Sequence, residues 1–146
     1  MRRLAALLVL VAACHGGHHH GPITHFDPNR LFVEVYAEGG NEDALRDGAA
    51  LGLSRVPFVV RVSGGGELEL QVEVSMLSTM HGQTRCGVKI LANRLPQHDL
   101  LGIADGSARA AGTDRRAATD CLSSLTTTLV GGKVRTLLHK RLEAKR

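Results

Sequence analysis

Cysteine and histidine supply most of the reactive side chains in this sequence. The three cysteines are Cys14, Cys86 and Cys121, and none of them forms a C-x-x-C pair, so a thiol redox enzyme is not expected. Imidazoles at high density can bind Cu²⁺, Zn²⁺ or Ni²⁺, although a glycine-rich segment fixes no ligand geometry. A weak metal site and a linker without metal therefore both stay open. The clustered histidines are His15, His18, His19, His20 and His25.

The residue types of a hydrolase triad are also present. His81 and Asp99 accompany Ser75 or Ser78, but no G-x-S-x-G sequence surrounds either serine. Neither glycine run of the chain fits the phosphate-binding pattern G-x-x-x-x-G-K-[ST]. We therefore expect these residues to lie in turns, and we expect no enzymatic activity and no cofactor.

The first fourteen residues have the organisation of an export signal. Arg2 and Arg3 precede an apolar run over residues 4–13, and Cys14 follows directly. The run is too short for a membrane-spanning helix, which needs about 20 residues. A basic start, a short apolar run and small residues at its end are typical of a secretory signal peptide. From the residues alone, Cys14 could follow such a signal by chance.

The string VAAC at residues 11–14 resembles the lipobox of bacterial lipoprotein precursors. This resemblance implies a signal peptide over residues 1–13, cleavage before Cys14, and a diacylglycerol on its thiol. Further acylation, such as palmitate, would anchor the chain stably, because a single acyl chain holds a membrane only marginally. His15 follows the cysteine where aspartate marks inner-membrane retention in enterobacteria. The resemblance therefore implies an outer-membrane lipoprotein, facing the periplasm or the cell surface.

Cys86 and Cys121 remain as an even pair in an oxidising compartment. Strand alternation places Cys86 on a buried face, and helical spacing places Cys121 on the apolar stripe of the last helix. A disulfide between sheet and helix is expected, and two buried free thiols are the alternative.

The hydrophobic pattern predicts an α+β domain over residues 31–146, after a flexible His/Gly tether over residues 14–30. Strands joined by short turns favour an antiparallel sheet of four to five strands, with helices on one face, in the order β-α-β-β-β-β-α. The alternation over residues 67–76 places Glu67, Glu69 and Glu73 on a solvent face. Gly131 and Gly132 either interrupt the last helix or lie within a continuous one. The expected strands are 31–38, 56–63, 67–76, 85–95 and 100–110, and the expected helices are 42–55 and 114–130.

The charge of the chain is concentrated at its C-terminal end. The net charge is +4 and falls to +2 without Arg2 and Arg3, so nucleic-acid binding is not expected. The four aromatic residues are too few for a stacking platform for sugars or bases. A basic final helix could meet an acidic partner or anionic headgroups, or could be a solvated helix face. The candidate contact residues are Lys133, Arg135, Lys140 and Arg141.

The order of elements after the lipobox is similar to that of small envelope lipoproteins. These include the lipopolysaccharide-assembly lipoprotein of the outer membrane and the lipoprotein activators of penicillin-binding proteins. The likeness implies a non-catalytic, membrane-anchored accessory protein that binds an envelope protein or assists assembly. Metal binding by the His-rich tether is the alternative function.

Overall fold

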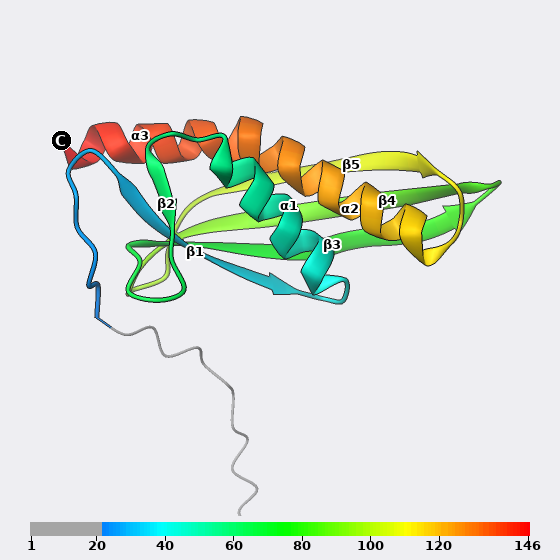
Figure 1. Ribbon diagram of the computed structural model, residues 1–146, viewed down its shortest axis with the longest axis horizontal. Helices are drawn as coiled ribbons and strands as arrows, with labels where there is room; N and C mark the ends of the chain where they lie inside the picture. Colours follow the sequence, from blue (N-terminus) through cyan, green and yellow to red (C-terminus); the bar gives the residue numbers. More distant parts are fainter. Residues whose placement is uncertain (1–21) are drawn as a thin grey trace, which may run out of the picture.

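The computed structural model describes residues 22–146 (Figure 1). The predicted signal peptide, Cys14, and the histidines at positions 15, 18, 19 and 20 lie outside these residues.

The described residues form one five-stranded sheet in the order β2-β1-β3-β4-β5 (Figure 1). β1 pairs in parallel with both β2 and β3, whereas β3, β4 and β5 pair antiparallel. The α+β class is confirmed, but the sheet is mixed, so the expectation of an antiparallel sheet was wrong. The strands are β1 (Leu31–Glu38), β2 (Val59–Arg61), β3 (Leu68–Met80), β4 (Gln83–Arg94) and β5 (Asp99–Ala111).

β2 and β3 lie on opposite sides of β1, and the segment that joins them passes across β1. Both strands can therefore run parallel to it. The backbone N–H of Val62 donates to the carbonyl of Val33, and that of Glu67 donates to the carbonyl of Phe32. The glycine run between β2 and β3 is therefore a crossing and not a hairpin turn. A Cβ on Gly66 would lie 2.9 Å from the Glu34 side chain and 3.1 Å from the Phe32 carbonyl, so the crossing needs glycine there.

Three helices lie on one face of the sheet, as expected (Figure 1). They are α1 (Glu42–Ser54), α2 (Arg115–Leu129) and α3 (Arg135–Lys145). A single π-helical turn, η1 (Val130–Val134), joins α2 to α3 without a break. The continuous form of the last helix is thus the correct one. Gly131 and Gly132 lie in this turn, where an added Cβ on either would meet nothing within 4 Å.

The core lies between this helical layer and the sheet. Fully buried aliphatic side chains from β1, β3 and β4 pack against Leu122, Val130 and Leu138 of the last helix. α1 approaches α2 closely, because a Cβ on Gly48 would lie 2.5 Å from the Ser123 carbonyl. A Cβ on Gly52 would lie 2.6 Å from Val130. The two glycines of α1 therefore permit helix-to-helix packing.

The alternation along β3 is only partly correct. Leu68, Leu70 and Val72 are buried against the helices as predicted. A register shift between Val74 and Met76 changes which side chains face the helices, and Met76 is 37% exposed.

The expectation of a solvent face for the glutamates was wrong at two positions, because Glu67 is 7% and Glu69 is 5% exposed. Glu73 is half-buried. Loops and polar partners cover that end of the face opposite the helices, which we call the open face.

Candidate partner-binding surfaces

Two of the four predicted cations form an exposed group on α3. Arg135 and Lys140 are exposed and line a shallow hollow of about 320 Å³ together with Thr136, His139 and Glu143. His139 also lies edge-on to the Phe58 ring at 5.6 Å, which fixes the base of this surface to the body of the domain. We call Arg135 and Lys140 the basic pair.

The other two predicted cations are held differently. Lys133 Nζ donates to the backbone carbonyl of Asp105 at 2.6 Å, so its ammonium lies against strand β5. Arg141 is half-buried, and its Nε has no hydrogen-bond partner among the described residues. The structure therefore separates the four residues: two present their charge outward together, one contacts the sheet, and one is partly inside.

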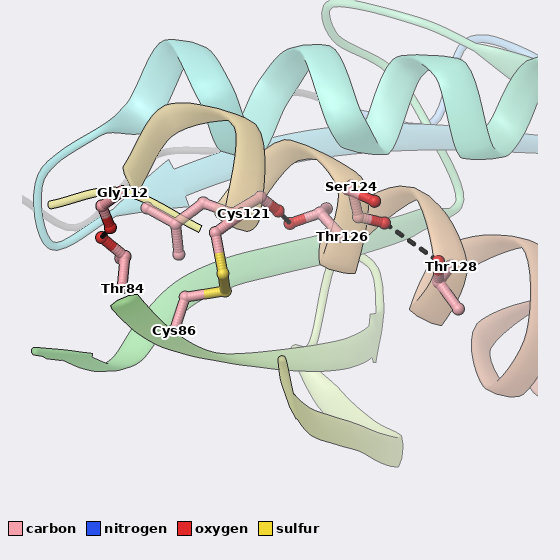
Figure 2. Close-up of a disulfide and its surroundings, with 8 residues drawn as sticks. Thr84, Cys86, Gly112, Cys121, Ser124, Thr126 and Thr128 are labelled. Carbon is pink, nitrogen blue, oxygen red and sulfur yellow. Dashed lines mark hydrogen bonds between the residues drawn. A yellow bond between two sulfur atoms is a disulfide. The ribbon is translucent and has the colours of Figure 1, made fainter. Parts of the chain in front are cut away.

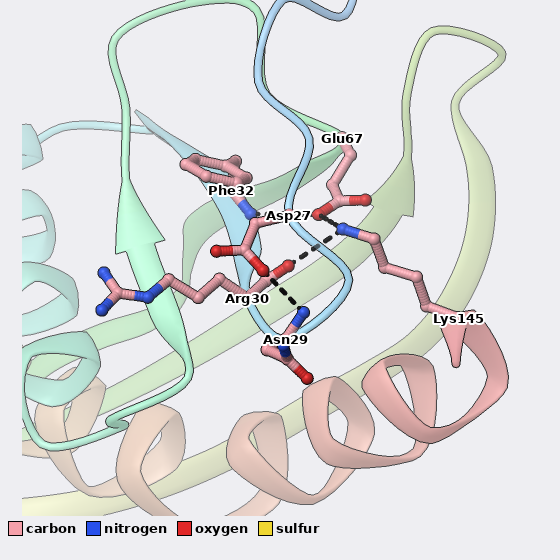
Figure 3. A network of polar contacts seen from close by, with 6 residues as sticks. All are labelled: Asp27, Asn29, Arg30, Phe32, Glu67 and Lys145. Atoms are coloured by element: carbon pink, nitrogen blue, oxygen red, sulfur yellow. Dashed lines mark hydrogen bonds and ion pairs between the residues drawn. The ribbon is translucent and has the colours of Figure 1, made fainter.

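A fifth cation, Lys145, lies inside the protein. Its side chain is only 5% exposed, and its Nζ lies 2.7 Å from Glu67 Oε1 and 2.9 Å from the carbonyl of Arg30 (Figure 3). The same Glu67 oxygen accepts the backbone N–H of Phe32. Lys145 Nζ also lies 4.5 Å from the centroid of the Phe26 ring. The end of α3 is thus joined to the segment before β1 and to Glu67, which directly precedes β3 and also bonds the backbone of β1.

That segment, residues 22–30, is the described part of the predicted tether. The backbone N–H groups of Thr24 and His25 both donate to the carbonyl of Gly65 in the crossing, at 3.1 and 3.4 Å. His25 stacks on the Phe32 ring with centroids 5.2 Å apart. The described end of the tether therefore contacts the open face, and residues 14–21 lie outside the described part.

Buried carboxylates line the covered end of the open face. Glu34 accepts the backbone N–H of Gly66 at 2.8 Å and the hydroxyl of Tyr36 at 3.0 Å. Burial raises the pKa of Tyr36 to about 12, with further increases from this hydrogen bond and from the negative charges of Glu34 and Glu69. Glu69 accepts from the Asn93 side chain at 3.2 Å. These groups satisfy one another, which indicates a structural role.

The predicted disulfide is present between Cys86 of β4 and Cys121 of α2 (Figure 2). Both residues are buried, with Cα atoms 6.2 Å apart. Strand parity and helical spacing correctly placed both side chains in the core. The bond joins the last helix to the sheet at the end where Thr84 Oγ1 donates to the carbonyl of Gly112 (Figure 2).

The residue types of a hydrolase triad do not come together. His81 lies in the turn between β3 and β4, whereas Asp99 begins β5 and pairs with Arg94 at the far end of β4. These positions are separated by nearly the full length of β4, on the order of 35 Å at 3.3 Å per residue. Within residues 22–146, no group of three His, Cys, Asp or Glu side chains is placed to hold a metal ion.

Sequence reasoning missed the burial of Lys145 and Glu67. Nothing in the spacing of α3 distinguishes Lys145 from Lys140, because the difference depends on which distant segment packs over each one. The scarcity of aromatic residues gives a weak signal, since Phe26 and Phe32 flank a segment that otherwise reads as a linker. Aromatic rings in such a segment can indicate packing against a domain.

No protein-family model matches this chain, and no curated protein matches it. The chain is similar in structure to protein XCC0632 from Xanthomonas campestris, of the family DUF330, with a TM-score of 0.55 and 13% identity. That likeness covers 87% of this chain and 95% of the other. Protein CT253 from Chlamydia trachomatis has a TM-score of 0.51 and 9% identity, covering 79% and 99% of the two chains.

Lipoproteins also occur among the similar structures. Lipoprotein GNA1162 from Neisseria meningitidis has a TM-score of 0.46 and 12% identity, over 75% of this chain and 99% of its own. Within residues 22–146, no helix is both long and apolar enough to span a membrane. At these identities the likenesses to XCC0632 and CT253 show a shared fold alone, and the chemistry of this chain rests on its own residues.

Proposed function

We propose that this protein is a non-catalytic bacterial lipoprotein, attached to the outer membrane through lipid on Cys14, that binds an envelope protein. The observation that carries the proposal is the buried disulfide between Cys86 and Cys121. Disulfides persist in exported proteins and are rare in the cytosol. With those two thiols paired, Cys14 is the one remaining cysteine, and it stands at the end of an apolar run after two arginines. That position suits lipidation.

The basic pair is the surface best suited to a partner. Arg135 and Lys140 are exposed on one side of α3, and the rest of that helix is packed on the sheet through Leu138 and Leu142. A rigid helix that presents two cations around a shallow hollow favours an acidic protein surface. Lys133 and Arg141 contribute less to this surface, because one contacts β5 and the other is half-buried.

The test begins with the full precursor expressed in a Gram-negative host, beside a Cys14→Ala control. We expect the parent protein in the outer-membrane fraction and the control in the soluble fraction. A parent protein found in the soluble fraction would overturn the lipid anchor. Whole-cell cross-linking followed by mass spectrometry then identifies what the membrane-bound protein contacts.

Charge reversal tests the surface itself. Arg135→Glu combined with Lys140→Glu should reduce recovery of the cross-linked envelope protein. Arg115→Glu combined with Arg116→Glu is the matched control, because it reverses two exposed cations at the opposite end of the same continuous helix. Equal recovery from both double variants would remove the basic pair from the proposal.

Metal binding by the tether remains the second candidate. Within residues 22–146 no group of three His, Cys, Asp or Glu side chains is placed to hold a metal ion. Such a site would use the predicted ligands of the tether, which are His15, His18, His19, His20 and His25. It predicts micromolar or tighter affinity for Cu²⁺ or Zn²⁺ in calorimetric titration, lost when His18, His19 and His20 are changed to alanine. Millimolar affinity would end this alternative.

A further inference from the structure

Strand β5 forms a long free edge of the sheet. It has 13 residues and pairs with β4 on one side, and no strand of the described chain pairs with its other side. The opposite edge is β2, which has only 3 residues. Long edges with unpaired backbone groups can add a further strand, and proteins usually shorten or cover them. The edge of β5 is therefore the better place for an added strand.

The contact of Lys133 shows which backbone groups face outward. Its ammonium reaches the Asp105 carbonyl from η1, on the side of β5 away from β4. In an antiparallel strand, the N–H and C=O of one residue point to the same side and alternate along the chain. Asp105, Ser107 and Arg109 therefore present their backbone groups at the free edge. Their side chains are exposed on the open face.

Charges on the open face alternate toward this edge. Lys89 Nζ lies 2.9 Å from Glu73 Oε1, and Lys89 stands opposite Asp105 in the register of β4 and β5. The row across β3, β4 and β5 is thus an acid, a cation and an acid. A strand added beyond β5 would best place a cation beside Asp105. Nearer the other end of β5, Arg109 stands opposite Arg85, a like-charged pair that an added acid would relieve.

We propose that a second copy of this chain pairs with β5, antiparallel to it, about a two-fold axis through Ser107. This register places Asp105 of each copy opposite Arg109 of the other. It continues the alternating row from Glu73 and Lys89, and it brings an acid beside the pair of Arg85 and Arg109. The small residues of β5 suit the register as well, because Gly106 stands opposite Ala108. A single self-complementary strand therefore provides both ion pairs.

The helical layer leaves room for this arrangement. α2 packs against both β4 and β5, so its axis is set back from the edge. With strands about 4.8 Å apart, the two related α2 helices would lie roughly 10 Å apart, which is a normal packing distance. The groove between β5 and α2 has a volume of about 470 Å³, and Ser124 and Thr128 line its helical side. These small side chains would allow the helices to meet.

Cysteine cross-linking of the full chain in whole cells tests the register. Ser107→Cys would face its own copy across the axis, with Cα atoms about 5.5 Å apart, within the range of a disulfide. We expect a band at twice the monomer mass that disappears on reduction. Ser54→Cys is the control, because this exposed serine ends α1 away from the edge. No dimer with Ser107→Cys, or an equal yield with Ser54→Cys, would overturn the proposal.

Charge exchange tests the ion pairs in the Ser107→Cys background. With Asp105→Arg, positions 105 and 109 of the two copies are both cationic at each of the two contacts in the dimer. With Arg109→Asp, both positions are acidic at each contact. Each single change should lower the cross-linking yield about tenfold, and the double change should restore it, because the pairs re-form with opposite sign. Single changes without effect, or a double change that stays low, would overturn the register.

Two further readouts separate this interface from alternatives. Lys133→Ala should raise the yield, since the Asp105 carbonyl is then released for strand pairing, and an unchanged or lower yield would count against pairing at that carbonyl. A cross-linked band of another mass would identify a different protein on β5 and overturn self-pairing. Reversal of the basic pair should leave the Ser107→Cys dimer unchanged, so failure of the proposed function and failure of this inference are distinguishable.

Discussion

The two faces of the sheet are stabilised in different ways. On the helical face, aliphatic residues of β1, β3 and β4 are buried under α1, α2 and α3, and the Cys86–Cys121 disulfide links the two layers. On the open face, loops and the segment before β1 cover only one end. There, charged and polar groups from distant parts of the chain satisfy one another, as in the contact of Lys145 with Glu67.

The same strands are therefore stabilised by two different kinds of interaction, one on each face. The helical face depends on apolar burial, which has no directional requirement and tolerates small movements of the packed side chains. The covered end of the open face depends on charged groups that are costly to leave unpaired. Substitutions on the two faces should therefore lower the free energy of unfolding for different physical reasons. Three substitutions measure this difference.

The largest effect is expected from the disulfide. Replacing both Cys86 and Cys121 with alanine should lower the free energy of unfolding by about 3–4 kcal/mol, because the bond closes a loop of about 35 residues in the unfolded chain. Urea unfolding followed by circular dichroism measures this. A reductant should shift the parent protein by the same amount and leave the variant unchanged. A loss below about 1 kcal/mol would show that apolar packing alone holds the helical face.

A smaller loss is expected on the open face. Lys145→Met removes the partner of a buried carboxylate and should cost about 2 kcal/mol, less than a fully buried pair because Glu67 keeps the N–H of Phe32. Lys140→Met is the control, since that residue is exposed, and it should change stability by less than about 0.5 kcal/mol. Equal effects would mean that the contact of Lys145 adds nothing to stability.

The smallest effect concerns the contact between helices. Gly48→Ala places a methyl group against the Ser123 carbonyl and should cost about 1–2 kcal/mol. Gly131→Ala meets open space within a helical turn and should raise stability by up to about 1 kcal/mol. Thermal melts of the two variants give the sign directly. Stabilisation by both would show that α1 can move away from α2 without loss.

Local patterns correctly predicted most of the elements and one of the contacts between them. Alternation along β3 and β4 and the spacing of α2 placed Cys86 and Cys121 in the same core, because side-chain direction follows from the period of each element. The same reasoning failed beyond Val74, where a register shift changes the parity of β3. The alternation continues from Val74 through Met76, across the register shift, and it breaks only at the adjacent apolar residues Met76 and Leu77.

Topology and long-range polar contacts could not be predicted from local patterns. The glycine run after β2 suits a hairpin and a crossing equally well, and the choice depends on whether β1 lies between the two strands. The candidate surface shows the same limit. Lys133, Arg135, Lys140 and Lys145 are alike in the sequence, and only packing against Asp105, Glu67 and Phe26 makes their roles different.

The hydrogen bond between Lys145 and Arg30 also affects the order in which contacts can form as the chain folds. It joins residues 115 positions apart, so it cannot form during synthesis or export until Lys145 itself has emerged. The hairpins formed by β3, β4 and β5 involve closer residues and can form earlier. A chain that stalls before Lys145 would hold the sheet with the carboxylate of Glu67, just before β3, left without this partner. Quality-control proteases could distinguish that state from the finished protein.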